Sequence, residues 1–209
     1  MILDMSSELQ KPEGMPEPQL YAEALEQVVL ADELGDGCWW SVEHHDTGHF
    51  SDCSTSDLML TLISQHSEQI HLGHSGVLAP FDIHHPMQIA ERAAFLDSVS
   101  RGRLELGLAR SLPREWETFG GDPDETRQQA GHDLDPLEVC EALEPFDAVI
   151  IGDVDTCRRK LERYAECGVD RLMCLMQMGP VPHETVMKSI RTAGKHLVPQ
   201  LAAFERSEA

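Results

Sequence analysis

Three ionisable side chains follow one another directly after a short apolar run. Residues 38–42, Cys-Trp-Trp-Ser-Val, read as a buried strand, and Glu43, His44 and His45 stand at its end. In α/β proteins, functional side chains gather at the carboxyl ends of parallel strands, because those ends open onto loops. Since imidazole titrates near neutral pH, this position predicts a group that gives or takes a proton. The alternative is that one histidine is a hydrogen-bonded structural residue and that Glu43 orients a neighbouring backbone or dimer contact.

Two further positions could contact a bound molecule. Arg110 follows an apolar segment at 104–109, where a guanidinium suits a phosphate or a carboxylate. An ion pair with one of the 37 acidic residues is the competing interpretation. Gly73 and Gly76 interrupt the apolar segment 70–78, which indicates a close approach to the backbone or relief of packing between strand and helix.

The histidines also permit a metal site. Its ligands would come from six residues that zinc or non-haem iron can bind, namely His44, His45, Asp46, His49, His84 and His85. Adjacent residues of a strand point to opposite faces, so His44 and His45 cannot both bind one ion unless the strand has already ended. We therefore predict no metal, and interpret His84-His85-Pro86 as a loop that enters a helix.

Strands and helices alternate along much of the chain. Apolar runs predict strands at 1–5, 38–42, 70–78, 104–109, 146–151 and 171–176. Helical spacing predicts helices at 20–34, through 58–63, and at 86–98, 155–167 and 183–197, the last of which stops before Pro199. We expect one short helix in the irregular segment 110–144. The repeat of strand, loop and helix predicts an α/β fold with a parallel sheet.

The composition excludes several classes of partner. Lys and Arg number 16 against 37 Asp and Glu, a net charge of -21, which disfavours nucleic acid and anionic membranes. The six cysteines form no CxxC pair and are interpreted as reduced thiols of a cytosolic protein. No segment approaches the ~18 apolar residues that a membrane span needs. The sequence therefore predicts a cytoplasmic protein.

Four stretches together resemble the bacterial luciferase-like monooxygenase family of flavin-dependent enzymes. They are VEHH at 42–45, IHLGHSGVLAP at 70–80, HHPMQIAERAAFLDSVSRGRLELGLARS at 84–111 and EWETFGGDPDETR at 115–127. Their order and spacing are similar to those of the family. GDVDTCRRKLERYAECGVDRLMCLM at 152–176 and the final helix ending in Val198-Pro199 resemble the family's C-terminal end. The resemblance implies a TIM-type (β/α) barrel.

The chain departs from the family in its middle. With 209 residues it is shorter than a complete barrel of about 250. The resemblance implies a single barrel domain over 1–209 that lacks about two βα units and the insertion that covers the active site. N-terminal βα units would occupy 1–130, a shortened link 131–145, and C-terminal units 146–209. Part of the family's flavin phosphate site lies in the missing segment, although the family's non-fluorescent flavoproteins are shortened barrels too.

The remaining residues can be interpreted in family terms. His44 and His45 match paired histidines, of which the first is implicated in catalysis. Ser75-Gly76 matches a position where the family often has a non-proline cis peptide against the isoalloxazine ring, and Arg110 matches a basic residue that contacts the flavin. The resemblance implies reduced FMN, or a deazaflavin in its place, with O2, a small organic substrate and a flavin reductase as partner.

Two functions remain open at this point. The first is a flavin-dependent monooxygenase in which His44, His45 and Glu43 are catalytic and Ser75, Gly76 and Arg110 contact the cofactor. The second is a non-catalytic member that binds flavin or serves as a partner subunit, having lost part of the cofactor site. A shortened barrel leaves exposed strand edges, so we expect a homodimer in either case.

Overall fold

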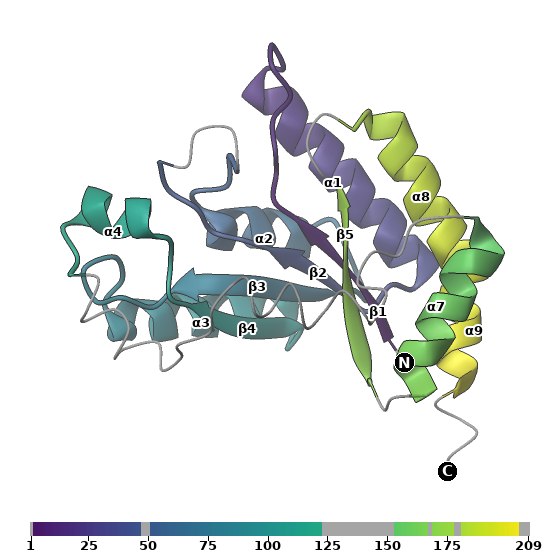
Figure 1. The fold of residues 1–209 in the computed structure, drawn as a ribbon. Helices are drawn as coiled ribbons and strands as arrows, with labels where there is room; N and C mark the ends of the chain where they lie inside the picture. The colour runs from purple at the N-terminus through teal and green to yellow at the C-terminus, as the bar shows by residue number, and fades with distance from the viewer. Residues whose placement is uncertain (1, 47–50, 123–152, 167–168, 178–180, 205–209) are drawn as a thin grey trace.

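The computed structural model describes residues 2–46, 51–122, 153–166, 169–177 and 181–204 (Figure 1). Helices and strands alternate along these ranges. In chain order they are β1 (Ile2–Ser7), α1 (Glu17–Leu34), β2 (Cys38–Ser41), α2 (Ser56–Ser64), β3 (His71–Leu78), α3 (Pro86–Ser100), β4 (Leu104–Ala109), α4 (Pro113–Phe119), α7 (Val154–Glu166), β5 (Arg171–Gln177), α8 (His183–His196) and α9 (Val198–Phe204).

Within the described ranges, five strands form one parallel sheet in the order β4-β3-β2-β1-β5. Figure 1 shows β5 running steeply across the direction of β3 and β4, so the sheet is strongly twisted and curled. The curl brings together strands at opposite ends of this order, because Arg171 Nη2 on β5 lies 3.7 Å from a carboxylate oxygen of Glu105 on β4. The predicted α/β class with a parallel sheet is confirmed, and the sheet is curled.

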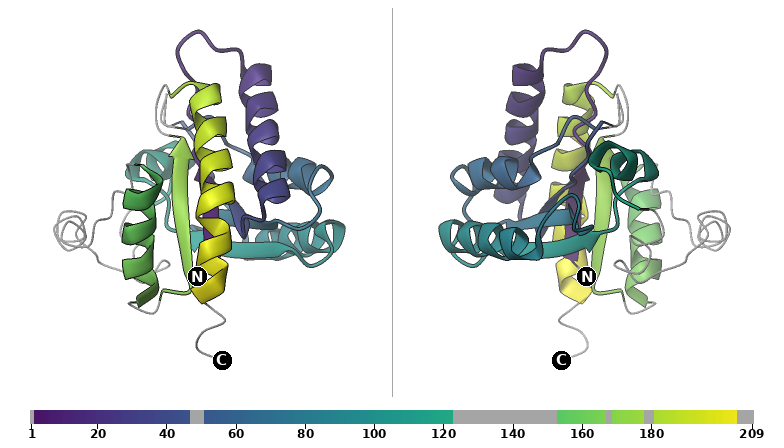
Figure 2. Two further views of the ribbon diagram at one scale, coloured as in Figure 1. Left: turned by 90° about the vertical axis from the view of Figure 1, so that its right-hand side faces the viewer. Right: turned by 90° about the vertical axis from the view of Figure 1, so that its left-hand side faces the viewer.

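Helices cover one face of this sheet. Along α1 the buried residues Leu20, Ala24, Val28 and Ala31 recur at three- and four-residue intervals, which places them on a single face. The helix ends at Gly35, whose φ of 81° is the left-handed conformation that glycine adopts readily. Figure 2 shows α8 and α9 in line with each other beside β5, next to α1.

The main apolar core lies between the sheet and these helices. Its residues come from strands and helices along the described chain, so the core joins the N-terminal and C-terminal βα units. Fully buried members include Met5, Val28, Leu60, Ile63, Leu72, Val186 and Ile190. Among the described residues, no helix is both long enough and apolar enough to cross a membrane.

The predicted elements agree with the structure in most places. β1 extends to Ser7 rather than stopping at residue 5, and β2 ends at Ser41. Glu43, His44 and His45 therefore lie beyond their strand, and the expected short helix after residue 110 is α4. The predicted strand at 146–151 and the link at 131–145 lie outside the described residues.

The predicted helix at 183–197 is confirmed as α8, but the prediction missed a further helix after it. The last predicted helix ends near Leu197, but Pro199 does not close the fold, because α9 begins at Val198. Proline in the first turn of a helix loses nothing, since the backbone N–H groups there have no intrahelical acceptor. Pro199 therefore marks a helix start as well as a helix end.

Candidate active site

An open cavity of about 310 Å³ lies at the carboxyl ends of β2, β3 and β4. A cavity of this size is typical of a small-molecule or cofactor site. It is lined by Val42, Glu43, His44, Ser75, Gly76, Leu78, Ala109, Arg110, Ser111 and Leu112. Five of the six site residues predicted from the sequence line this cavity, and His45 is the exception.

Gly76 lies where β3 and β4 come close together. A Cβ added to it would lie 2.9 Å from the Cβ and the backbone nitrogen of Ala109. Because part of that obstacle is backbone, a side chain fits only if the two strands move apart. The Ser75–Gly76 peptide is cis, as the resemblance implies, and the pairing of β3 with β4 shifts register between His74 and Val77. The close approach predicted from this glycine is therefore made by the neighbouring strand, not by a helix.

Arg110 is held at the cavity wall by an aromatic ring. Its guanidinium carbon lies 4.3 Å from the centre of the Trp116 ring, and Trp116 Nε1 donates a hydrogen bond of 3.0 Å to the Arg110 carbonyl oxygen. Stacking on an indole favours the cation and limits its freedom. This arrangement places a fixed positive charge beside the cavity.

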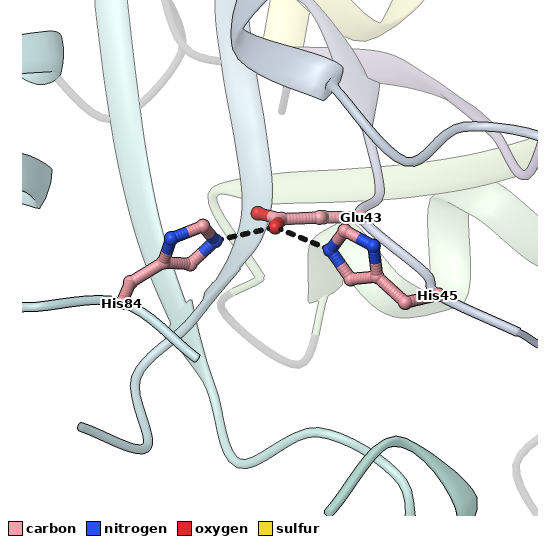
Figure 3. A group of neighbouring side chains, drawn as sticks. All are labelled: Glu43, His45 and His84. Carbon is pink, nitrogen blue, oxygen red and sulfur yellow. Dashed lines mark hydrogen bonds and ion pairs between the residues drawn. The ribbon is translucent and has the colours of Figure 1, made fainter. Parts of the chain in front are cut away.

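Glu43 is the centre of a network of imidazoles (Figure 3). Its side chain is 5% exposed, and its Oε1 accepts hydrogen bonds from His45 Nε2 at 3.0 Å and His84 Nε2 at 2.5 Å. His74 Nε2 lies 3.4 Å from Oε2 and also contacts the Ser56 hydroxyl. Burial alone would raise the pKa of Glu43, but the hydrogen bonds from these histidines outweigh it and hold the pKa well below its usual range.

These distances favour a hydrogen-bond network over a metal site. Glu43, His45 and His84 offer ligand atoms within 4.8 Å of one another. Ligands about 2.1 Å from one ion are roughly 3 Å or more apart, whereas the Glu43 and His84 atoms are 2.5 Å apart. The Glu43 and His84 atoms are therefore closer together than two ligands of one ion, as in a direct hydrogen bond.

The other residues considered as metal ligands are dispersed. Asp46 accepts hydrogen bonds from Arg114, and His85 Nδ1 accepts one from the backbone N–H of Met87 at the start of α3. His85 therefore enters a helix, as its sequence context predicts. His49 lies outside the described residues. The absence of a metal stays a prediction.

His44 belongs to a different network from His45. Its Nδ1 lies 3.2 Å from Glu115 Oε1, and its Nε2 lies 3.5 Å from Glu8 Oε2. Burial would lower the pKa of His44, but the two carboxylates outweigh it and the pKa is raised above its usual value. The two adjacent histidines therefore differ in their partners.

Glu115 is a site residue that the sequence did not reveal. It is completely buried, and it accepts hydrogen bonds from the Ser111 hydroxyl and the Leu112 N–H, each at 2.6 Å, and from the His45 N–H at 2.7 Å. Burial would raise its pKa, yet these donors and His44 lower it. A usable signal was present: Pro113 opens α4 and Glu115 is the third helical residue, where a carboxylate caps free N–H groups.

The comparison with protein families decides what kind of protein this is. A family model described as luciferase-like monooxygenase matches residues 5–144, more than half of the chain. The chain belongs to the luciferase-like monooxygenase family. The resemblance found in the sequence motifs is thereby confirmed.

Curated family members match over part of their length. A luciferase-like monooxygenase of Escherichia coli K12 is 30% identical over 139 residues, which are 66% of this chain and 39% of that protein. The oxygenase component of a flavin-dependent trigonelline monooxygenase of Acinetobacter baylyi is 36% identical over 92 residues, 44% of this chain and 25% of the relative. The chain thus spans about two fifths or less of these relatives' length.

Solved structures share the fold at low sequence identity. The monooxygenase RslO1 from Streptomyces bottropensis superposes with a TM-score of 0.80 at 17% identity, over 96% of this chain and 99% of that one. The oxygenating constituent of 3,6-diketocamphane monooxygenase from Pseudomonas putida, in complex with FMN, gives 0.54 at 16% identity, over 78% and 38%. The coenzyme F420 dependent tetrahydromethanopterin reductase of Methanopyrus kandleri gives 0.67 at 12%, over 96% and 99%. These similarities support the fold of the family.

Proposed function

We propose that this chain is a flavin-dependent monooxygenase that uses reduced FMN and O2 to oxidise a small organic substrate. The observation that carries the proposal is the cavity at the carboxyl ends of β2, β3 and β4, which is lined by the imidazole of His44 and the guanidinium of Arg110. In this proposal the catalytic residues are Glu43, His44 and His45, and the flavin contacts Ser75, Gly76 and Arg110.

The residues at the cavity fit a flavin. Gly76 leaves the β3 wall without a side chain, so a flat ring could lie against it. The Arg110 guanidinium suits the anionic or carbonyl groups of the cofactor. When bound, the reduced flavin would supply the electrons that activate oxygen. His44 would hold a proton at the cavity wall, and Glu43 would fix His45 and His84 beside it.

The family members favour FMN without excluding a deazaflavin. The Acinetobacter baylyi relative is described as flavin-dependent, and the Pseudomonas putida structure contains FMN. The Methanopyrus kandleri structure belongs to an F420-dependent enzyme. We therefore propose reduced FMN first and a deazaflavin as its replacement.

We also propose a separate flavin reductase and a homodimer. The Acinetobacter baylyi relative is an oxygenase component, which supports a reductase as partner. Partly exposed apolar side chains on the outermost described strands, β4 and β5, support association with a second copy. They are Leu106, Leu108, Met173 and Leu175. A monomeric mass in light scattering at micromolar concentration would contradict the homodimer.

A non-catalytic flavin-binding or partner-subunit role is the second candidate. It is favoured by the length of the chain, which spans 39% or less of the curated relatives described above. Parts of a cofactor site that those relatives carry elsewhere could therefore be absent from this chain.

Cofactor titration separates the two candidates. Purified protein is titrated anaerobically with FMN, reduced FMN and a deazaflavin, and then exposed to oxygen while flavin absorbance is recorded. We expect tight binding of reduced FMN and a rate of reoxidation that changes in His44→Ala. The matched control is His66→Ala, because His66 is exposed in the turn after α2 and does not line the cavity. Binding with unchanged reoxidation in His44→Ala would favour the non-catalytic flavin-binding role. Binding no tighter than millimolar, about 4 kcal/mol, would refute the monooxygenase and the flavin-binding role and leave the partner-subunit role.

A further inference from the structure

The ring of His44 lies between two carboxylates that come from distant parts of the chain. Glu115 on α4 faces Nδ1 at 3.2 Å, and Glu8, directly after β1, faces Nε2 at 3.5 Å. Glu115 is completely buried, and the facing Oε2 of Glu8 is buried too. Each ring nitrogen of this imidazole therefore faces a carboxylate oxygen away from bulk water.

A neutral imidazole cannot satisfy both neighbours. It carries one N–H and one lone pair, so a proton on Nδ1 directs the Nε2 lone pair at Glu8. A proton on Nε2 instead directs the Nδ1 lone pair at Glu115. Both neutral forms set a lone pair against a carboxylate. The doubly protonated imidazolium donates a hydrogen bond from Nδ1 to Glu115 and places positive charge beside Glu8, which removes this repulsion.

Glu8 depends on the charge of His44 more than Glu115 does. Glu115 has three other donors, from Ser111, Leu112 and His45. Glu8 Oε2 has no hydrogen-bond partner among the described residues, so its charge is compensated through the ion pair with His44. A buried carboxylate without a partner is costly, and a cation at Nε2 offsets that cost.

We propose that Glu8 and Glu115 are positioning residues that keep His44 doubly protonated at the cavity wall at neutral pH. The other charged groups at this wall are engaged elsewhere: Glu43 accepts hydrogen bonds from His45 and His84, and Arg110 stacks on Trp116. Together with Arg110, His44 gives the cavity two cations. Such a wall favours an anionic ligand and makes His44 a proton donor rather than a base.

The protonation state can be measured without any ligand. Protein with ¹⁵N-labelled histidine is titrated by NMR in the absence of flavin, and the His44 signals are assigned with His44→Gln. In the wild type we expect both ring nitrogens to be protonated at pH 7 and the His44 pKa to lie above the ordinary value of about 6.5. Removing one charge with Glu8→Gln or Glu115→Gln should lower that pKa by about one unit or more.

Glu117→Gln is the matched control, because Glu117 lies on α4 and is exposed. It should leave the His44 pKa unchanged. If Glu115→Gln destabilises the fold but the His44 pKa stays the same in both Glu8→Gln and Glu115→Gln, the two carboxylates have only a structural role and the proposal is wrong. A neutral His44 in the wild type at pH 7 would also overturn it.

The proposal rests on the proposed function only for its consequence in catalysis. If flavin fails to bind while the His44 pKa responds to both substitutions, the proposed function fails and the protonation inference stands. If flavin binds and reoxidation depends on His44, the reoxidation rate should fall as the pH rises and His44 loses its proton. In Glu8→Gln this fall should occur at lower pH than in the wild type. An identical pH profile would contradict the role as proton donor.

Discussion

Buried carboxylates at the two ends of the strands differ in the direction in which their pKa values are shifted. Beyond the carboxyl ends of the strands, Glu43 and Glu115 accept several N–H or O–H donors, and the pKa of each is lowered. Before β2, Asp36 is 4% exposed and neither of its oxygens has a hydrogen-bond partner among the described residues. Burial, with the charge of Asp4 added, raises the pKa of Asp36 to about 7.

The difference shows that donors, more than depth, decide the charge of a buried acid in this protein. Asp4 is an intermediate case. It is completely buried on β1, and its Oδ2 accepts hydrogen bonds from Trp40 Nε1 at 2.9 Å and Arg171 Nη1 at 3.3 Å. Its Oδ1 has no partner among the described residues, and burial still raises its pKa. Two donors on one oxygen do not offset the loss of water around the other.

The largest effect that would test this comparison is the pH dependence caused by Asp36. Its pKa is about 7 in the folded state and 3.8 as the reference, so the folded state binds more protons between these values and stability falls as the pH rises through that window. Three pKa units correspond to about 4 kcal/mol at most. Asp36→Asn should therefore gain stability relative to the wild type from about pH 4 to pH 8, measured as urea unfolding free energies.

The difference in unfolding free energy between the wild type and Asp36→Asn isolates the titration of Asp36, because the other acids titrate in both proteins. A stability difference that stays constant across this pH range would show that Asp36 does not titrate near neutrality in the folded protein. The contrast between Asp36, which has a raised pKa, and the two glutamates with lowered pKa values would then no longer hold.

At the carboxyl end of the strands, Glu43→Ala should destabilise the fold by roughly 3 kcal/mol, because buried imidazole N–H groups lose their acceptor. The sign of the pH dependence is opposite to that of Asp36. The folded pKa of Glu43 is depressed, so its contribution is present above the reference pKa of 4.5 and is lost as the pH falls below it. Chemical unfolding at pH 7 and at about pH 4 measures both effects.

Glu117→Ala is the control for the substitution itself, since exposed positions change stability by about 0.5 kcal/mol or less. A loss below about 1 kcal/mol in Glu43→Ala would mean that water replaces the carboxylate without cost. In that case the imidazole network is not a structural feature of the fold.

The sequence predicts the elements better than it predicts these networks. Strands such as 104–109 and helices such as 86–98 are local patterns of apolar residues bounded by glycine or proline, so each can be recognised without its neighbours. The paired histidines after β2 are likewise visible as a strand end. The same local signals single out Gly76 within β3 and Arg110 directly after β4, and both residues line one cavity.

The partners of these residues depend on which strand ends meet, and no local pattern contains that information. Glu115 is 71 residues from His44 in the chain, and Glu8 precedes it by a whole βα unit. The division of the two histidines between Glu115 and Glu43 also depends on the path of residues 42–46 after β2. Without the sheet order, an acidic chain with 37 candidates offers no way to choose these carboxylates.

A smaller effect is expected from backbone contact at the carboxyl end. In Gly76→Ala the new methyl would lie 2.9 Å from Ala109 atoms of β4, so β3 and β4 must separate there. Overpacking of this kind costs about 1–3 kcal/mol. The change should also weaken reduced-FMN binding, because the cavity wall moves. Unfolding and titration measure the two effects, and an unchanged unfolding midpoint would show that the strands accommodate a methyl group.

The smallest effect on stability should come from the exposed ion pair between Arg114 and Asp46, which joins the same two segments as the Glu115 contacts. Arg114 Nη2 lies 3.2 Å from Asp46 Oδ1, and so joins α4 to the same loop that Glu115 holds through the His45 N–H. The side chains of this ion pair are 62% and 55% exposed, whereas Glu115 is completely buried. Arg114→Ala should therefore cost about 0–1 kcal/mol, and the cost should vanish near 1 M salt, where the screening length is about 3 Å. Because both contacts join the same two segments, a loss above about 2 kcal/mol would show that position in the fold, rather than burial and donors, determines how much a carboxylate contributes.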